Sequence, residues 1–137
     1  MPYRKAEIRP FREEDEAVLF GLARLDRGAD SRTIAVLERE TVFVAELEGS
    51  PAGYVALARA EDAVRIDQLF VSPEHEAEGI GRQLLEWAEG YAISKRAARL
   101  QVVVEAGNRR ALDFYRGRGF TEAGENLLAL QLPGSIS

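Results

Sequence analysis

The stretch Val71-Ser72-Pro73-Glu74-His75-Glu76-Ala77-Glu78-Gly79-Ile80-Gly81 decides the fold of this chain. An apolar run over residues 66–71 stops at Ser72-Pro73, and the glycine pair at 79 and 81 opens a long amphipathic segment that predicts a helix. A strand, a glycine turn and a helix start expose backbone N–H groups at the positive end of a helix dipole, a geometry that binds phosphate or pyrophosphate. Glycine is needed there because a Cβ would obstruct the turn and the close approach of an anion.

A second motif lies farther along the chain: Asn108-Arg109-Arg110-Ala111-Leu112-Asp113-Phe114-Tyr115-Arg116-Gly117-Arg118-Gly119-Phe120. Asn108 is a good N-cap for a short helix. Three apolar or aromatic side chains, Ala111, Phe114 and Tyr115, have the i, i+3, i+4 spacing that puts them on one helix face. The helix is expected to end near Gly117 or Gly119.

Together the two motifs resemble the GNAT superfamily of acyl-CoA-dependent N-acetyltransferases. The matching patterns are Val-x-Pro-Glu followed by a Gly-x-Gly helix start, and Asn-x-x-Ala-x-x-Phe-Tyr-x-x-x-Gly-Phe. With the flanking elements, the resemblance covers nearly the whole chain. It implies a single-domain α+β GNAT fold over residues 1–137, with a mixed, mostly antiparallel sheet of about six to seven strands, a central parallel pair and about four helices.

Residue patterns place the elements in order. The expected strands are 6–9, a hairpin of 41–47 and 53–58, then 64–71, 100–104 and 127–132. The expected helices are 13–24, with Val18, Leu22 and Leu25 as its apolar stripe, a short one from Ser31, one from Ile80, and one after Asn108. The helix from Ile80 should bury Leu84, Leu85, Ala88, Tyr91 and Ala92. A strand–helix–strand crossover over 64–104 makes its two strands parallel.

Composition narrows the class of protein. A chain of 137 residues with 46% apolar residues fits one globular domain. The absence of cysteine excludes disulfides, thiolate metal sites and a cysteine nucleophile, and a single histidine argues against a metal site. A net charge of −5 disfavours nucleic acid as a partner. No signal-like region and no run approaching ~18 apolar residues is present, so a cytoplasmic protein without a membrane partner is expected.

The resemblance implies how acetyl-CoA, the expected co-substrate, would bind. Backbone N–H groups would hold the pyrophosphate, main-chain groups of the preceding strand would position the pantetheine arm and thioester, and one side chain would hold the arm or a bridging water. These cofactor-binding residues are Ala77, Glu78, Gly79, Ile80, Gly81 and Arg82, then Leu69, Phe70 and Val71, and finally Asn108. The chain departs from the family at Glu76, where Arg or Gln is usual, and Glu74 and Glu78 add two further carboxylates that weaken anion binding.

The resemblance also implies catalytic roles. Tyr115 would protonate the departing thiolate, because the ordinary pKa of a phenol, near 10, is close to that of an alkyl thiol; the alternative is that it packs with Phe114 as core. Asp67, where many relatives carry Glu, would take the proton of the amine, or would be a carboxylate paired with Arg65. Glu105 is a second candidate base, whereas His75 is expected to be an ordinary exposed loop residue.

The function indicated is an acetyl-CoA-dependent N-acetyltransferase that moves an acetyl group directly to a primary amine, without a metal. The acidic loop favours an alternative, a non-catalytic acyl-CoA-binding or regulatory module. A nucleotide-binding domain of another fold is disfavoured because neither a Gly-x-Gly-x-x-Gly after the first strand nor a Lys-Ser or Lys-Thr after the glycine turn is present. The acceptor stays open among small-molecule and peptide amines, and Trp87, expected on the outer side of its helix, hints at a homodimer.

Overall fold

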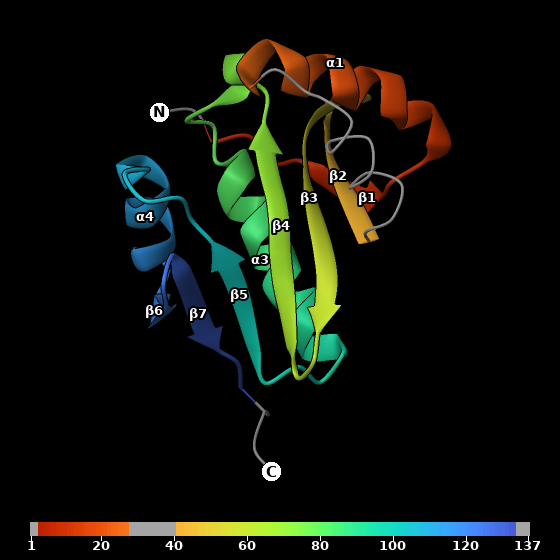
Figure 1. Ribbon diagram of the computed structural model, residues 1–137. Helices are drawn as coiled ribbons and strands as arrows, with labels where there is room; N and C mark the ends of the chain where they lie inside the picture. The colour runs from red at the N-terminus through yellow and green to blue at the C-terminus, as the bar shows by residue number, and fades with distance from the viewer. Residues whose placement is uncertain (1–2, 28–40, 134–137) are drawn as a thin grey trace. The chain divides into compact units, whose positions relative to one another are not determined.

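Seven strands form one sheet in the order β1-β2-β3-β4-β5-β7-β6 in the computed structural model, which describes residues 3–27 and 41–133 (Figure 1). The strands are β1 (Glu7–Pro10), β2 (Thr41–Leu47), β3 (Ser50–Ala60), β4 (Ala63–Val71), β5 (Arg99–Val103), β6 (Thr121–Gly124) and β7 (Leu127–Gln131). The described helices are α1 (Glu16–Arg27), α3 (Ile80–Ser94) and α4 (Arg109–Arg116), with short 3-10 turns η1 (Glu13–Asp15) and η2 (Pro73–His75).

The pairing of the strands confirms the predicted fold class. β4 and β5 are parallel, with Ala63 opposite Arg99 and Ile66 opposite Val102, and α3 supplies the connection between them. The pairs β1·β2, β2·β3, β5·β7 and β6·β7 are antiparallel. The sheet is therefore mixed and mostly antiparallel around one parallel pair, as expected. The short helix predicted from Ser31 lies outside the described residues.

The described residues divide into two compact units. Residues 3–27, 41–57 and 68–87 form the first unit, and residues 58–67 and 88–133 form the second. Three elements, β3, β4 and α3, each contribute residues to both units. Neither unit is therefore a continuous segment of the chain.

The first unit contains an apolar core on the strands β2, β3 and β4. Val42 pairs with Ala56 and Val44 with Tyr54 across the β2–β3 ladder, and all four side chains are buried. Leu19 of α1 and Phe70 of β4 complete this cluster. The prediction that Val18 belongs to the buried stripe of the first helix is wrong, because Val18 is 47% exposed and Leu19 is fully buried. The side chains of Leu22 and Leu25, the other members of the predicted stripe, lie outside those that the structure describes.

An ion pair fixes the entry into α1. The guanidinium of Arg9 donates from Nη1 and Nη2 to the two carboxylate oxygens of Asp15, both at 2.8 Å, and from Nε to Glu46 at 2.7 Å. Asp15 also accepts the backbone N–H of Arg12 at 2.7 Å. These hydrogen bonds, that of Arg9 foremost, hold the pKa of Asp15 below its ordinary value although burial opposes this. The same contacts raise the pKa of Arg9, so the pair stays ionised at neutral pH.

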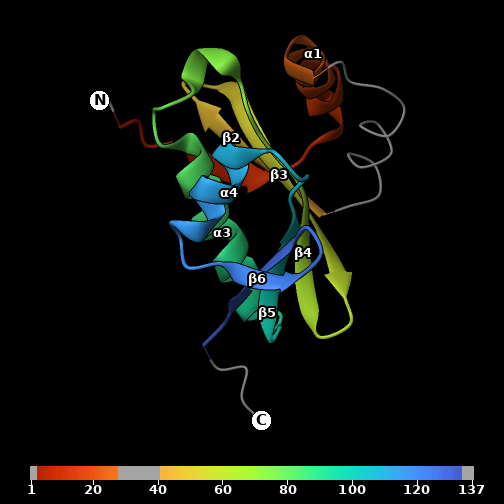
Figure 2. The same cartoon turned by 60° about the vertical axis from the view of Figure 1, so that its left-hand side comes forward.

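The second unit buries one face of β5 and β7. Leu100 and Val102 of β5 are buried beside Leu128 of β7. In the views of Figures 1 and 2, α4 lies above the β6–β7 hairpin.

Four of the five predicted core positions of the helix from Ile80 are fully buried, namely Leu84, Leu85, Ala88 and Ala92, whereas Tyr91 is half-buried. The helical periodicity therefore identified the buried face of α3.

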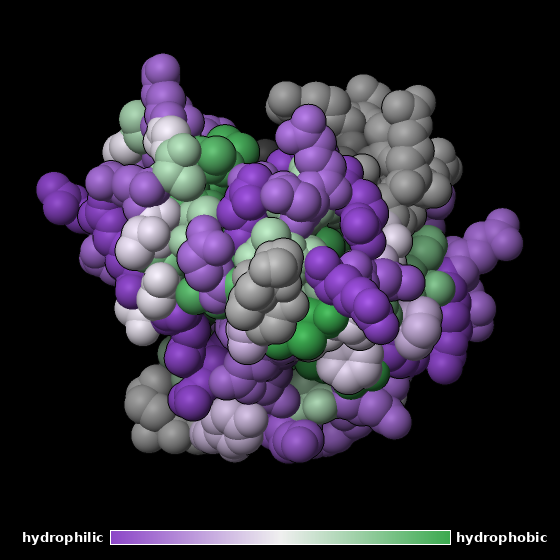
Figure 3. Space-filling model, turned by 90° about the horizontal axis from the view of Figure 1, so that it is seen from below, coloured by the Kyte–Doolittle hydropathy of each residue, from purple (hydrophilic) through white to green (hydrophobic). Residues whose placement is uncertain are grey.

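The turn between β3 and β4 is anchored in the second unit. Ala98 N–H donates to Asp62 O at 2.7 Å, and Arg99 pairs with the Asp62 carboxylate at 2.9 Å. Figure 3 views this end of the molecule, where hydrophilic side chains (purple) surround smaller groups of hydrophobic ones (green). Scattered apolar groups of this kind are ordinary on a protein surface.

Candidate active site

The loop that the sequence predicts between a strand and a helix start is present between β4 and α3. Ser72, buried, donates its N–H to Ala52 O at 2.8 Å, and η2 and a turn lead to the start of α3 at Ile80. Ala77 and Gly79 both have left-handed backbone angles, with φ of 68° and 85°. Because Ile80, Gly81 and Arg82 form the first turn of α3, their N–H groups have no intrahelical acceptor. The loop thus presents a helix start whose donors are available to an anion.

Glycine at position 79 is required for two reasons. Its φ lies in the region that glycine adopts without steric cost. In addition, a Cβ at this position would lie 2.7 Å from Cδ1 of Tyr3. The Tyr3 ring therefore occupies the space that a side chain would need.

Two of the three loop carboxylates are placed so that they oppose an anion less than the sequence suggested. Glu78 is 19% exposed, and its Oε1 lies 3.0 Å from His75 Nδ1 and 4.0 Å from a guanidinium nitrogen of Arg4. Glu74 is 76% exposed, so water screens its charge. The interpretation of His75 as an ordinary exposed residue is wrong in one respect, since its side chain is only 22% exposed and contacts Glu78.

The guanidinium of Arg82, at the start of α3, pairs within its own helix and not with the carboxylates of the loop. Its Nε donates to Glu86 Oε2 at 3.2 Å, one helical turn along α3. Both side chains are more than half exposed, so this pair contributes little stability and can open.

The end of β4 alternates between core and surface. Phe70 is buried in the first unit's core, with its ring centroid 5.7 Å from that of Tyr54, whereas Leu69 and Val71 are half-buried. Tyr54 donates its hydroxyl to Gln68 Oε1 at 2.5 Å. A Cβ on Gly53 would lie 2.5 Å from Phe70 O, so glycine at this position of β3 allows the backbones to approach closely.

In the second unit, Asn108 and Tyr115 sit at opposite ends of α4. Asn108 caps the helix as predicted, accepting the Ala111 N–H at 3.2 Å. Tyr115 is 6% exposed and lies between two rings, those of Phe114 and Phe120, at centroid distances of 5.1 and 5.3 Å in edge-to-face geometry. The packing role considered for Tyr115 is therefore present.

The two candidate bases have different surroundings. Asp67 accepts two hydrogen bonds from Arg65, at 2.5 Å from Nε and 3.1 Å from Nη2, so the predicted pairing with Arg65 exists. Glu105 is exposed and follows β5. Asp67, Glu105, Asn108 and Tyr115 all belong to the second unit, whereas the loop and residues 68–71 belong to the first.

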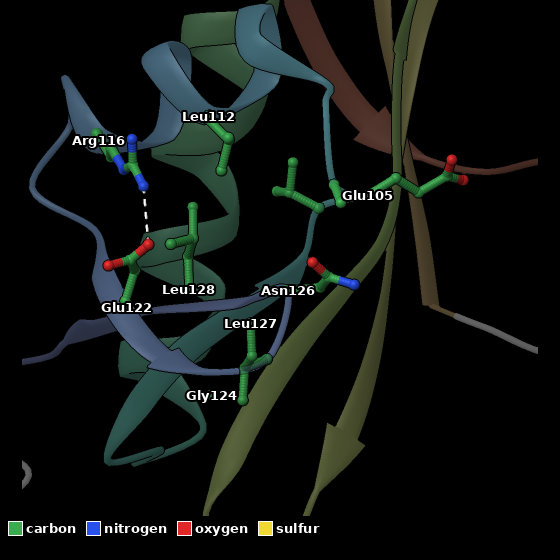
Figure 4. Close-up of a pocket in the computed structure, with 10 residues that line it drawn as sticks. Glu105, Leu112, Arg116, Glu122, Gly124, Asn126, Leu127 and Leu128 are labelled. Atoms are coloured by element: carbon green, nitrogen blue, oxygen red, sulfur yellow. Dashed lines mark hydrogen bonds and ion pairs between the residues drawn. The ribbon is translucent and has the colours of Figure 1, made fainter.

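Glu105 lies on the rim of a pocket of about 100 Å³ in the second unit (Figure 4). Leu112 of α4 and Leu128 of β7 point toward each other across it, and Arg116 pairs with Glu122 at 2.8 Å on one side. The remaining lining residues are Val104, Ala106, Gly124, Asn126 and Leu127. Sequence reasoning identified Glu105 but not this pocket, because it depends on the β6–β7 hairpin, whose first strand is entirely exposed and carries no alternating pattern.

Two further findings concern metals and membranes. Among the side chains that the structure describes, those of residues 3–21 and 41–133, no group of three or more acidic or histidine side chains could hold a metal ion. Among the helices that the structure describes, none has the length and apolar character needed to cross a bilayer.

The fold and the loop between β4 and α3 define the class of protein. The sequence profile of the acetyltransferase (GNAT) family matches residues 4–120, so the chain belongs to this family. An uncharacterised N-acetyltransferase of Archaeoglobus fulgidus is 34% identical over 85 residues, which are 57% of this chain and 58% of that protein. The chain spans about half the length of the curated relatives it matches.

Solved structures share the fold. The ribosomal-protein-S18-alanine N-acetyltransferase of Escherichia coli superposes with a TM-score of 0.81 at 22% identity, covering 97% of this chain and 96% of that one. The PaiA N-acetyltransferase of Thermoplasma acidophilum, solved in complex with coenzyme A, gives a TM-score of 0.73 at 16% identity, covering 94% of this chain and 99% of that one.

Proposed function

We propose that this chain, as one domain, transfers an acetyl group from acetyl-CoA directly to a primary amine. The observation that carries the proposal is the loop between β4 and α3, in which left-handed residues at Ala77 and Gly79 lead into a helix start with free N–H donors, in a member of the GNAT family. The coenzyme A complex of a protein with the same fold supports the choice of co-substrate.

Binding of the pyrophosphate of acetyl-CoA is assigned to the first unit. The N–H groups from Ala77 to Arg82 bind the pyrophosphate, and the pairing of Glu78 with His75 and Arg4 lowers the repulsion that its carboxylate would exert. Main-chain groups of residues 69–71 pair with the pantetheine arm, and one of their N–H groups polarises the thioester carbonyl. Asn108 contributes to the arm beyond its capping role.

The chemical step is assigned to Asp67 and Tyr115. Asp67, directly or through water, takes a proton from the ammonium group, and the neutral amine attacks the thioester carbon. The new C–N bond forms as the C–S bond breaks, Tyr115 gives its phenolic proton to the departing thiolate, and the proton that the new amide nitrogen loses passes through water to restore the Tyr115 phenol. The products are an amide and free coenzyme A, and no covalent enzyme intermediate is needed.

Calorimetric titration of the full chain with acetyl-CoA, repeated with 3′-dephospho-CoA, tests the binding step. Micromolar affinity for acetyl-CoA supports the proposal and justifies a screen of polyamines, amino acids and peptide N-termini for thiol release. A weaker affinity for the dephosphorylated ligand would assign a role to the arginines around Asn108. No binding up to millimolar concentration contradicts the proposal.

One observation favours a second function, a non-catalytic acyl-CoA-binding module. Asp67 is held by two hydrogen bonds from Arg65, which occupy both of its carboxylate oxygens, the atoms that would accept the proton of the amine. This alternative predicts acetyl-CoA binding without amine-dependent thiol release for every acceptor class in the screen.

A further inference from the structure

The segment Tyr3–Ala6 lies across the anion-binding loop at the start of α3. Arg4 N–H donates to Glu78 O at 3.0 Å, and the Tyr3 ring fills the Cβ position of Gly79. The Arg4 guanidinium pairs with Glu48 and faces Glu78 at 4.0 Å. Two residues before β1, Tyr3 and Arg4, therefore contact the loop.

Gln83 ties this segment to the loop. The residue is 7% exposed, and both ends of its side-chain amide are used. Its Oε1 accepts Ala6 N–H at 2.9 Å, and its Nε2 donates to Arg4 O at 2.7 Å and to Gly79 O at 3.1 Å. Gly79 O also accepts the backbone N–H of Gln83 at 3.2 Å. Two of the partners of this buried amide belong to the N-terminal segment and one to the loop. The amide therefore fixes the geometry of the segment relative to the loop.

These hydrogen bonds fix the direction of two peptide groups of the loop. Gln83 and Arg4 hold the carbonyls of Gly79 and Glu78, and a peptide plane whose carbonyl is held has its N–H direction fixed as well. The N–H groups that follow those carbonyls belong to Gly79 and Ile80. A loop without these anchors would sample other orientations, and acetyl-CoA affinity would fall by the fraction of time spent in the binding orientation.

We propose that Gln83, by tying the segment Tyr3–Ala6 to the loop, is a positioning residue for the pyrophosphate site. This inference rests on the proposed binding of acetyl-CoA by the loop. It makes the N-terminal segment part of the binding machinery although neither Gln83 nor Tyr3 need touch the ligand.

The test uses Gln83→Met, which keeps the length of the side chain and removes the three hydrogen bonds of its amide group. If the loop then occupies the binding geometry one time in ten, the dissociation constants of acetyl-CoA and of 3′-dephospho-CoA both rise about tenfold, with their ratio unchanged. Hydrogen exchange of the amides at 77–82 in the unliganded protein should become faster. Leu19→Ala is the control, because it destabilises the same unit from its core without touching the loop.

The inference is overturned if Gln83→Met leaves the dissociation constants unchanged, or if Leu19→Ala weakens binding equally. If Gln83→Met does not fold, Tyr3→Ala replaces it, since Tyr3 is 59% exposed and its loss exposes Gly79 without disturbing the core. If the unmodified chain does not bind acetyl-CoA, the proposed function fails, and exchange alone then decides: faster exchange confined to 77–82 supports positioning by Gln83, and unchanged exchange refutes it.

Discussion

At the residue scale, the ring and the hydroxyl of Tyr115 have separable roles. The ring packs between Phe114 and Phe120, and Phe at this position keeps that packing. We expect Tyr115→Phe to lower turnover by about 10²–10⁴-fold, the usual contribution of a general acid, while acetyl-CoA affinity stays the same. The rate of thiol release at saturating amine and a calorimetric titration measure the two quantities. Unchanged turnover would remove Tyr115 from the mechanism.

Two glycines offer a matched comparison of backbone space. A Cβ at Gly53 would lie 2.5 Å from the backbone oxygen of Phe70, whereas a Cβ at Gly90 in α3 meets nothing within 4 Å. We expect Gly53→Ala to lower the free energy of unfolding by about 1–3 kcal/mol, because two backbones must separate. Gly90→Ala should raise it by about 0.5–1 kcal/mol, because alanine favours the helix.

Urea denaturation of both glycine variants gives these free energies from the shift in midpoint at constant slope. A stable Gly53→Ala variant would mean that β3 and β4 can move apart without cost. A destabilised Gly90→Ala variant would mean that the outer face of α3 at this position is covered.

At the scale of elements, the contact between β1 and η1, the turn that precedes α1, depends on pH. The pKa of Asp15 is lower in the folded protein than in the unfolded chain, whose ordinary value is about 3.9. Between the two values the unfolded chain binds more protons, so stability rises with pH. The contribution of Asp15 is therefore complete above about pH 4 and is lost as the pH falls through the lower, folded value.

Asp15→Asn tests this dependence. At pH 7 we expect the variant to be less stable by about 3 kcal/mol, the lower end for a broken buried pair, because Arg9 keeps Glu46 as a partner. Unfolding free energies measured from pH 7 down to pH 2 should show the difference shrinking in acid. A constant difference over this range would mean that the ion pair is not its source.

The predictability of the elements varied for physical reasons. β2 was predicted to the residue because β-branched and aromatic side chains run from Thr41 to Leu47 between polar neighbours. Val18 was mispredicted because the spacing of apolar residues does not show which of two neighbouring apolar positions of α1 faces the core, and Leu19 is the one that is buried. β6 escaped prediction because all four of its residues are exposed.

At the scale of the whole molecule, the two motifs predicted the loop between β4 and α3 and the cap at Asn108, whereas the packing of Tyr115 beside Phe114 was the alternative to its catalytic role. The anchoring of the loop was not predictable, because Gln83 bonds to Ala6 and Arg4, which are 77 and 79 residues away in the chain. The one signal available was a polar residue at 83, between Ile80 and Leu84, next to a buried stripe. Whether the predicted site residues act together stays a prediction.

The two units should unfold together in one cooperative transition. Because β3, β4 and the continuous helix α3 each run through both units, neither unit can unfold without disrupting elements of the other. We expect a single thermal transition, with equal calorimetric and van't Hoff enthalpies. Acetyl-CoA at 100 times its dissociation constant should stabilise the fold by about 2.7 kcal/mol and shift the midpoint by on the order of 10 °C. If two transitions appeared and the ligand moved only one of them, the chain would behave as two domains and not as one cooperative unit.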